Sequence, residues 1–186
     1  MANSKMILQN VRCAFISIDR PKRGSMGGKY SVQIILPNSD KQLAAMRSKA
    51  KDVALEEFGS SALGKVTMPF RNGDTEREEA HYKGTRYMSA NSPRKPGIVN
   101  RFNIPATDED MEELAYSGAY YHLSVTLFTY VNEGKKGVGV GLNHVMLLGG
   151  GQRLDGRTTA AEDFASLAES PDGFDDDIDE DFEDGK

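Results

Sequence analysis

The residue pattern of the chain predicts a mainly β protein built around one small barrel. Short runs rich in β-branched and aromatic residues are separated by Gly, Pro and Asn, which are typical turn residues. The sequence has 19 Gly and no Trp, and only two segments show the spacing of three and four residues that is typical of a helix. About five or six strands with one long and one short inserted helix fit a Greek-key barrel of the OB type.

Two strands and a long helix are expected in the first third of the chain. Met6–Ile18 alternates as a strand does, with Arg12 on the outer face and an inner face formed by Ile7, Val11, Cys13 and Phe15. After a basic loop, Tyr30–Pro37 predicts a second strand, which Pro37 ends because proline cannot donate to the ladder. Ser39 or Asp40 then caps a helix that runs to about Phe58.

Shorter elements are expected in the middle of the chain. Gly64–Glu79 has the composition of a loop, with a turn signal at Asn72–Asp74. Two short strands are predicted at His81–Ala90 and Gly97–Pro105. Thr107 then caps a short acidic helix, because its hydroxyl can accept a hydrogen bond from the first turn.

The clearest predicted element is a hairpin formed by Ala119–Val131 and Gly137–Leu148. Its first strand should bury one set of apolar side chains, Leu123, Val125 and Leu127. The opposite face should present Tyr120, His122, Phe128 and Tyr130 together. The glycines of its second strand lack the spacing of a dinucleotide-binding loop, so we expect them to mark bends or bulges.

Acidic residues are concentrated at the end of the chain. Residues 169–186 hold ten Asp and Glu against one Lys, so the whole chain has a net charge of −5, whereas residues 1–168, with 22 Lys and Arg against 18 Asp and Glu, have +4. Such an acidic segment buries too little apolar surface to fold by itself. We therefore expect one folded OB-type domain over residues 1–168 and a disordered acidic tail over residues 169–186.

The sequence gives little support for an enzyme or a metal site. The phosphate-loop motif is absent, and the three histidines lie in separate predicted strands without the spacing of metal ligands. We expect no catalytic residue, no metal and no cofactor. Cys13 is the only cysteine, and no apolar run reaches the roughly twenty residues of a membrane span. These features predict a soluble, cytoplasmic protein without a membrane partner.

Basic and aromatic side chains predict a surface that binds a single-stranded nucleic acid. Lys and Arg neutralise phosphates, and aromatic rings stack on bases, each stack being worth about 1 to 3 kcal/mol. The candidate DNA-binding residues are Arg12, Lys22, Arg23, Lys29, Tyr82, Lys83, Arg86, Tyr87, Arg94, Lys95, Arg101, Phe102, Tyr120, His122 and Tyr130. The alternative, that the aromatic residues of the strands pack the barrel, stays open.

The tail carries its own binding signal in Phe174, Ile178 and Phe182, which are spaced by four residues. A helix that formed on docking would place these side chains on one side, so we expect them to bind replication or recombination proteins. The ten carboxylates also imitate a run of phosphates, and the tail should therefore compete with DNA for the cationic body. Chance spacing in an acidic segment is the alternative.

Four segments carry a resemblance to a known family. They are the run GGKYSVQIILP, the turn Asn72–Asp74, the basic segment that ends ANSPRKPGIV, and the long block from Tyr116 to Phe164. With them the chain resembles the bacteriophage single-stranded DNA-binding proteins that carry an acidic carboxy-terminal tail. The resemblance implies an OB fold, single-stranded DNA as the ligand, no catalysis, and a tail that contacts replication or recombination proteins.

The function that these features favour is sequence-nonspecific binding of single-stranded DNA during phage replication, recombination or repair. A single-strand annealing protein is one alternative, and an acidic module that binds only proteins is another. The sequence leaves open whether copies of the chain form a homo-oligomer.

Overall fold

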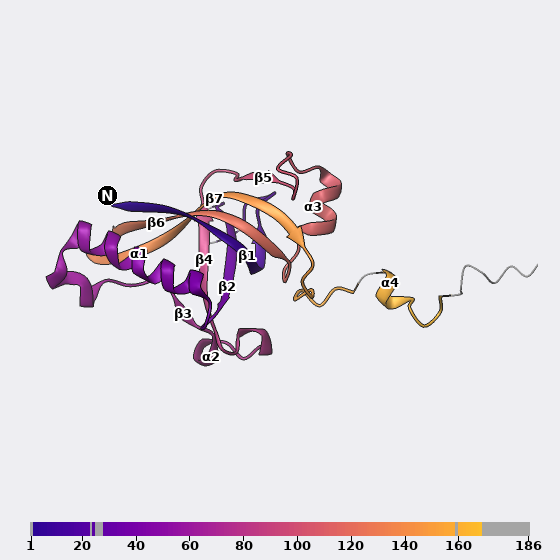
Figure 1. Ribbon diagram of the computed structural model, residues 1–186, viewed down its shortest axis with the longest axis horizontal. Helices are drawn as coiled ribbons and strands as arrows, with labels where there is room; N and C mark the ends of the chain where they lie inside the picture. The colour runs from indigo at the N-terminus through magenta and orange to yellow at the C-terminus, as the bar shows by residue number, and fades with distance from the viewer. Residues whose placement is uncertain (1, 23, 25–27, 159, 169–186) are drawn as a thin grey trace, which may run out of the picture. The chain divides into compact units, whose positions relative to one another are not determined.

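Five strands of one seven-stranded sheet close into a barrel, because β4 pairs with β7 (Figure 1). The seven strands of the sheet are β1 (Asn3–Ser17), β2 (Tyr30–Pro37), β3 (Arg71–Asn72), β4 (Thr85–Ser92), β5 (Gly97–Val99), β6 (Tyr120–Asn132) and β7 (Lys135–Gly149). Their order is β3-β4-β2-β1-β6-β7-β5, and a parallel contact between β4 and β7 closes the ring. The other pairs of the ring are antiparallel. The predicted OB-type barrel is therefore confirmed.

The computed structural model describes residues 2–22, 24, 28–158 and 160–168. The barrel belongs to one compact unit, Met1–Asp155, and a second unit begins at Gly156. Within that second unit the described residues include the short helix α4 (Ala160–Asp163). Several candidate residues lie outside the described residues, namely Arg23, Phe174, Ile178 and Phe182. The expected boundary between residues 168 and 169 stays a prediction.

Strand β1 is bent by two irregularities that the sequence pattern did not reveal. Its register shifts between Leu8 and Val11, where it pairs with β6, and between Ala14 and Ser17, where it pairs with β2. Each extra residue reverses which face the following side chains occupy. The prediction that Ile7 and Phe15 face inward was therefore wrong, because each is 56% exposed. Leu8 is buried in place of Ile7, and after the second shift Ile16 and Ile18 contact the main core in place of Phe15.

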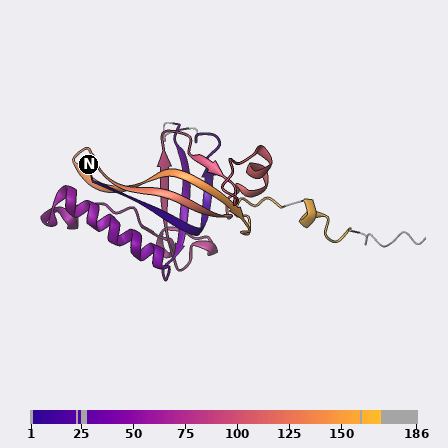
Figure 2. The same ribbon diagram turned by 45° about the horizontal axis from the view of Figure 1, so that its top comes forward.

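Helix α1 (Lys41–Phe58) matches its prediction, and the side chain of Asp40 accepts a hydrogen bond from the backbone N–H of Gln42. Gly59, at φ 75°, ends the helix in a conformation that glycine adopts without strain. The buried face consists of Leu43, Met46, Ala50, Val53 and Ala54. Figure 2 shows the helix alongside the long ends of β6 and β7, and this face packs into the main core.

The middle of the chain is more structured than predicted. The expected loop, Gly64–Glu79, contains the end of the 3-10 helix η1 (Ser60–Lys65), strand β3 and the short helix α2 (Gly73–Glu76). The 3-10 helix η2 (Ala80–Tyr82) replaces the start of a predicted strand, because Gly84 at φ 68° turns the chain before β4. The next predicted strand shortens to β5. Helix α3 (Asp108–Leu114) begins at a complete capping box formed by Thr107 and Asp110.

The β6–β7 hairpin confirms its prediction, with Glu133 and Gly134 at positive φ in the turn. Leu123, Val125 and Leu127 are buried as predicted. The glycines of β7 serve close packing rather than bends. A Cβ atom at Gly137 would lie 2.3 Å from the ring of Tyr130, and one at Gly139 would lie 2.7 Å from the ring of Phe128. These glycines let both rings lie against the backbone of the partner strand.

Two apolar clusters stabilise the barrel unit. The larger one fills the barrel and joins it to α1. The smaller one lies on the outer face of β1, β2 and β4 and consists of Ala14, Ile35, Tyr82 and Tyr87. Among the described residues, no helix is both long enough and apolar enough to cross a membrane.

Candidate nucleic-acid interface

A basic groove lies where β1, β6 and β7 meet the loop between β4 and β5. Lys5 comes from β1, Thr126 from β6, and Arg94 and Lys95 from the loop. The hollow has a volume of about 510 Å³, and its lining residues are Lys5, Ser92, Arg94, Lys95, Gly97, Thr126, Leu142, Asn143 and His144. No carboxylate occurs among these lining residues, so the charges that face the groove are positive.

A second hollow of about 290 Å³ extends the first, because Gly97 and His144 line both. It adds His122, Ser124 and the turn residue Asn103 to the surface. A Cβ atom at Gly97 would lie 2.8 Å from Nδ1 of His144. Glycine at this position therefore leaves room for the imidazole of His144 beside β5. The two hollows together are called the groove below.

The groove carries cations that differ in their availability. Among the described residues, Lys5 and Arg94 form no ion pair, whereas Nζ of Lys95 lies 2.7 Å from a carboxylate oxygen of Asp19. This hydrogen bond and the opposite charge raise the pKa of Lys95 and lower the pKa of Asp19. Both partners are about half exposed, so the pair is open to competition from other anions.

An apolar tip follows β5 and borders the second hollow through Asn103. Its Phe102 and Ile104 are 71% and 57% exposed. The side chain of Asn100 fixes the turn, since its Oδ1 accepts the backbone N–H of Phe102 at 3.0 Å and that of Ile104 at 3.3 Å. The guanidinium of Arg101 lies 5.5 Å from the centre of the Phe102 ring. The tip is thus a preformed platform with a cation beside it.

The structure gathers only some of the predicted binding residues here. Arg94, Lys95 and His122 line the groove, and Arg101 and Phe102 form its tip. Nδ1 of His122 accepts the backbone N–H of Asn10 at 2.9 Å, which fixes the orientation of the ring. Lys22 and Lys29 are exposed in the loop between β1 and β2, where the N–H of Lys22 donates to the carbonyl of Lys29.

Burial corrects the expectation that Tyr82 and Tyr87 stack bases. Tyr82 is fully buried and Tyr87 is 4% exposed, so neither ring has a free face. The two rings pack edge to face, with centres 5.3 Å apart, and the hydroxyl of Tyr82 donates to Gln33. Both belong to the small outer cluster. The packing alternative therefore holds for these two aromatic residues.

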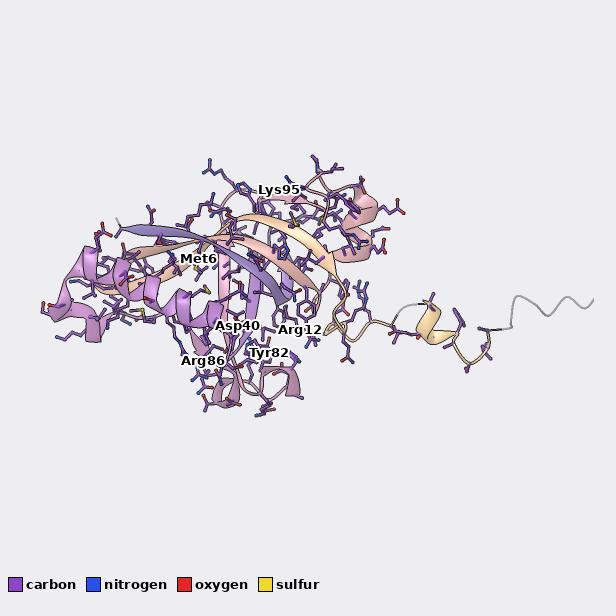
Figure 3. All side chains as sticks on the ribbon, in the orientation of Figure 1. Met6, Arg12, Asp40, Tyr82, Arg86 and Lys95 are labelled. Atoms are coloured by element: carbon purple, nitrogen blue, oxygen red, sulfur yellow. The ribbon has the colours of Figure 1, made fainter. Side chains whose placement is uncertain are left out.

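Three further candidates make contacts that hold the fold together. The guanidinium of Arg12 donates to the carbonyls of Gly118 and Gln152 at 3.1 and 3.0 Å. Arg86 donates to Oδ1 of Asn72 at 2.9 Å, and the exposed Lys83 lies 3.5 Å from the carbonyl of Asp74. In Figure 3, Arg86 and Tyr82 lie on the side of α2, whereas Lys95 lies beside β5.

Two candidates on β6 stay apart from the groove. Tyr120 and Tyr130 are half-buried, and neither lines the two hollows. Sequence reasoning in turn missed Lys5, Asn143 and His144. Lys5 was missed because it shares a face with Ile7, which the pattern wrongly placed inside the barrel. Asn143 and His144 could not be found, because the register shift opposite Ser124 and Val125 makes Asn143 an extra residue and pairs His144 with Ser124.

The chemistry of the groove suits an extended polyanion. Lys and Arg supply charge for phosphates, and the exposed ring of Phe102 supplies a face for a base. In the part of the chain that the structure describes, no group of three His, Cys, Asp or Glu side chains is placed to hold a metal ion.

Comparison with known proteins assigns the family. The family model described as "Enterobacter phage Enc34, ssDNA-binding protein" matches residues 4–181. The chain belongs to this family. A relative, protein p50 of Acyrthosiphon pisum secondary endosymbiont phage 1, is 30% identical over 177 residues, which span 88% of this chain and 94% of p50. A family of DNA-binding proteins agrees with the expectation that the chain is not an enzyme.

Two solved structures show the same barrel. The single-stranded DNA-binding protein of bacteriophage Enc34 in complex with ssDNA has a TM-score of 0.68 at 17% identity, over 81% of this chain and 89% of that chain. The single-stranded DNA-binding protein gp2.5 of bacteriophage T7 has a TM-score of 0.54 at 18% identity, over 91% and 97% of the two chains. At these identities the likeness establishes the fold.

Proposed function

We propose that this chain binds single-stranded DNA without sequence preference. The observation that carries the proposal is a groove lined by Lys5, Arg94 and Lys95, with no carboxylate in its lining, beside the exposed ring of Phe102. Cations that face phosphates and a ring that faces a base do not select a sequence, because every nucleotide offers both groups. Membership in the Enc34 family supports the same ligand.

The biological role that fits this binding is protection of single strands in phage replication, recombination or repair, in the cytoplasm of the host cell. The acidic segment of residues 169–186 adds a second function in this proposal. Its ten Asp and Glu residues compete with phosphates for the groove and so regulate access. Its apolar residues, Phe174, Ile178 and Phe182, bind replication or recombination proteins when DNA has displaced the tail.

Two charge-matched triple variants test the groove. The first replaces the groove cations Lys5, Arg94 and Lys95 by Ala. The second replaces Lys41, Lys51 and Lys65, which are exposed on α1 and η1, by Ala. Both remove three positive charges, so any difference between them reports position rather than net charge. Binding is followed by fluorescence titration with a labelled oligonucleotide at several salt concentrations.

The groove variant should bind at least tenfold more weakly at low salt. Its log-log salt slope should be shallower by about 2, since each phosphate contact contributes about 0.7. The α1 variant should stay close to the unmodified chain. If both variants lose the same amount of affinity, binding depends on the net charge of the protein and not on the groove. No binding by the unmodified chain at low salt would favour an acidic module that binds only proteins.

A further inference from the structure

We propose that Phe15 and Arg77 form a second nucleotide site on the outer face of β1, β2 and β4, in which a base stacks on Phe15 and a phosphate pairs with Arg77. The inference rests on the proposed function, because the ligand is another part of the same bound strand. It adds a site that the sequence pattern hides, since Phe15 was expected inside the barrel.

The first observation is the backbone of Phe15. Its φ is 49°, in the left-handed region that a bulky residue rarely adopts. Neighbouring contacts impose this conformation: the N–H of Phe15 donates to Oγ of Ser117 at 3.3 Å, and the carbonyl of Cys13 accepts the N–H of Gly118 at 2.7 Å. The result is an exposed aromatic ring on a strained bulge. Strain of this kind concentrates at functional sites.

The second observation is the position of Arg77. Its guanidinium carbon lies 5.7 Å from the centre of the Phe15 ring, 5.2 Å from that of Tyr82 and 5.1 Å from that of Tyr87. The two tyrosine rings are buried and packed together, so they hold the guanidinium from behind. Phe15 remains 56% exposed in spite of this contact and has free surface for a base.

Arg77 has a carboxylate near it but, in the described part of the chain, no direct partner: a backbone hydrogen bond and, after it, the charge of Arg77 lower the pKa of the exposed Glu79. Among the described residues Arg77 forms no ion pair within 4.0 Å. The nearby carboxylate of Glu76 pairs with Arg71 at 2.7 Å and lies 3.3 Å from the hydroxyl of Tyr87. A half-buried guanidinium beside an exposed ring matches the phosphate and base of one nucleotide.

A polar path connects this site to the groove. On β4 the outward residues after Tyr87 are Ser89 and Asn91, and Ser92 already lines the groove. Five residues of strand span about 17 Å, a distance that a few nucleotides of an extended strand can cover. One strand of DNA can therefore contact both sites.

The strained backbone supplies a test that separates binding from folding. Asn tolerates left-handed φ better than Phe, so Phe15→Asn should leave the melting temperature unchanged or raise it. The same variant should bind single-stranded oligonucleotide about five- to 150-fold more weakly, which corresponds to the loss of one stack. A stabilised protein that binds less well is not the result of unfolding. Val131→Asn, at a similarly exposed apolar position, should bind normally.

Arg77→Met provides the second arm, since it keeps an apolar stem over the rings and removes the charge. It should reduce the salt slope by about 0.7. Suppose that the groove triple variant binds more weakly, as the proposed function expects, while Phe15→Asn in the full-length protein binds as tightly as the unmodified chain. This result would overturn the Phe15 site and leave the proposed function intact. If the unmodified protein does not bind oligonucleotide at all, the proposed function fails first.

Discussion

Tyr82 shows why a single aromatic residue in a sequence does not reveal its role. Aromatic rings next to Lys and Arg are typical both of base-stacking surfaces and of barrel packing. The sequence around Tyr82 and Tyr87 has this composition, yet the fold turns both rings toward Ile35 and Ala14. Phe102 has the same neighbours in sequence and is exposed, because Asn100 fixes its turn. Whether such a ring is buried or exposed depends on contacts with residues that are distant in sequence, which a local pattern does not reveal.

The packing role of Tyr82 predicts a change in stability without a change in binding. Tyr82→Phe keeps the ring and removes the hydroxyl that donates to the buried Gln33. The unpaired amide oxygen should lower the free energy of unfolding by about 1 to 3 kcal/mol. Urea denaturation measures the loss, and affinity for single-stranded oligonucleotide should stay within about twofold. A large loss of affinity at unchanged stability would show that the Tyr82 hydroxyl takes part in binding and would contradict a purely packing role.

The stacking role of Phe102 predicts the opposite pattern. Phe102→Leu keeps an apolar side chain but removes the flat ring, so binding should weaken by about 1 to 3 kcal/mol. Phe102→Tyr keeps the ring and should bind like the unmodified chain. Stability should hardly change in either variant, because the residue is 71% exposed. If Leu and Tyr at this position bind equally well, the tip does not stack a base.

At the scale of elements, the sequence predicts what local periodicity controls. Helix α1 and the β6–β7 hairpin have the expected bounds to within a few residues, because their patterns repeat over many positions. Strand β1 was assigned to the right segment but to the wrong faces at Ile7 and Phe15, since its bulges depend on pairing with β2 and β6. The groove also depends on strand pairing, because Lys5 and Arg94 are far apart in sequence and line one hollow only in the folded sheet.

Asp19 in the β1–β2 loop pairs with Lys95 in the β4–β5 loop, and removal of this carboxylate should increase the affinity for single-stranded DNA. Lys95 lowers the pKa of Asp19, so this carboxylate stays ionised near neutral pH and competes with phosphate for Lys95. Asp19→Asn should therefore tighten binding at low salt by about two- to fivefold. Asp52→Asn on α1 removes the same charge and should have less effect. The gain should vanish when Lys95→Met is added, and a gain that persists would exclude this competition.

At the scale of the whole molecule, opposite charges are separated along the chain. Residues 1–168 carry a net +4 and residues 169–186 a net −9, so the sequence alone predicts a cationic body and an anionic end. The closure of the barrel through β4 and β7 was not predictable from these charges, because it joins segments about fifty residues apart.

The charge separation predicts that the tail weakens DNA binding. Truncation after Ala168 should tighten binding to single strands at low salt, because the removed carboxylates occupy the same cations as phosphates. A full-length variant with all ten tail Asp and Glu replaced by Asn and Gln should behave like the truncation, which separates charge from length. Unchanged or weaker affinity in both proteins would refute competition by the tail.

The central claim is that the body binds single strands through phosphates in the groove. Titration of the intact protein with single-stranded and duplex oligonucleotides of equal length, at two salt concentrations, tests it most directly. We predict tighter binding to the single strand and an affinity that falls with salt at about 0.7 log units for each phosphate contact. A salt-independent affinity, or equal affinity for the duplex, would contradict the account.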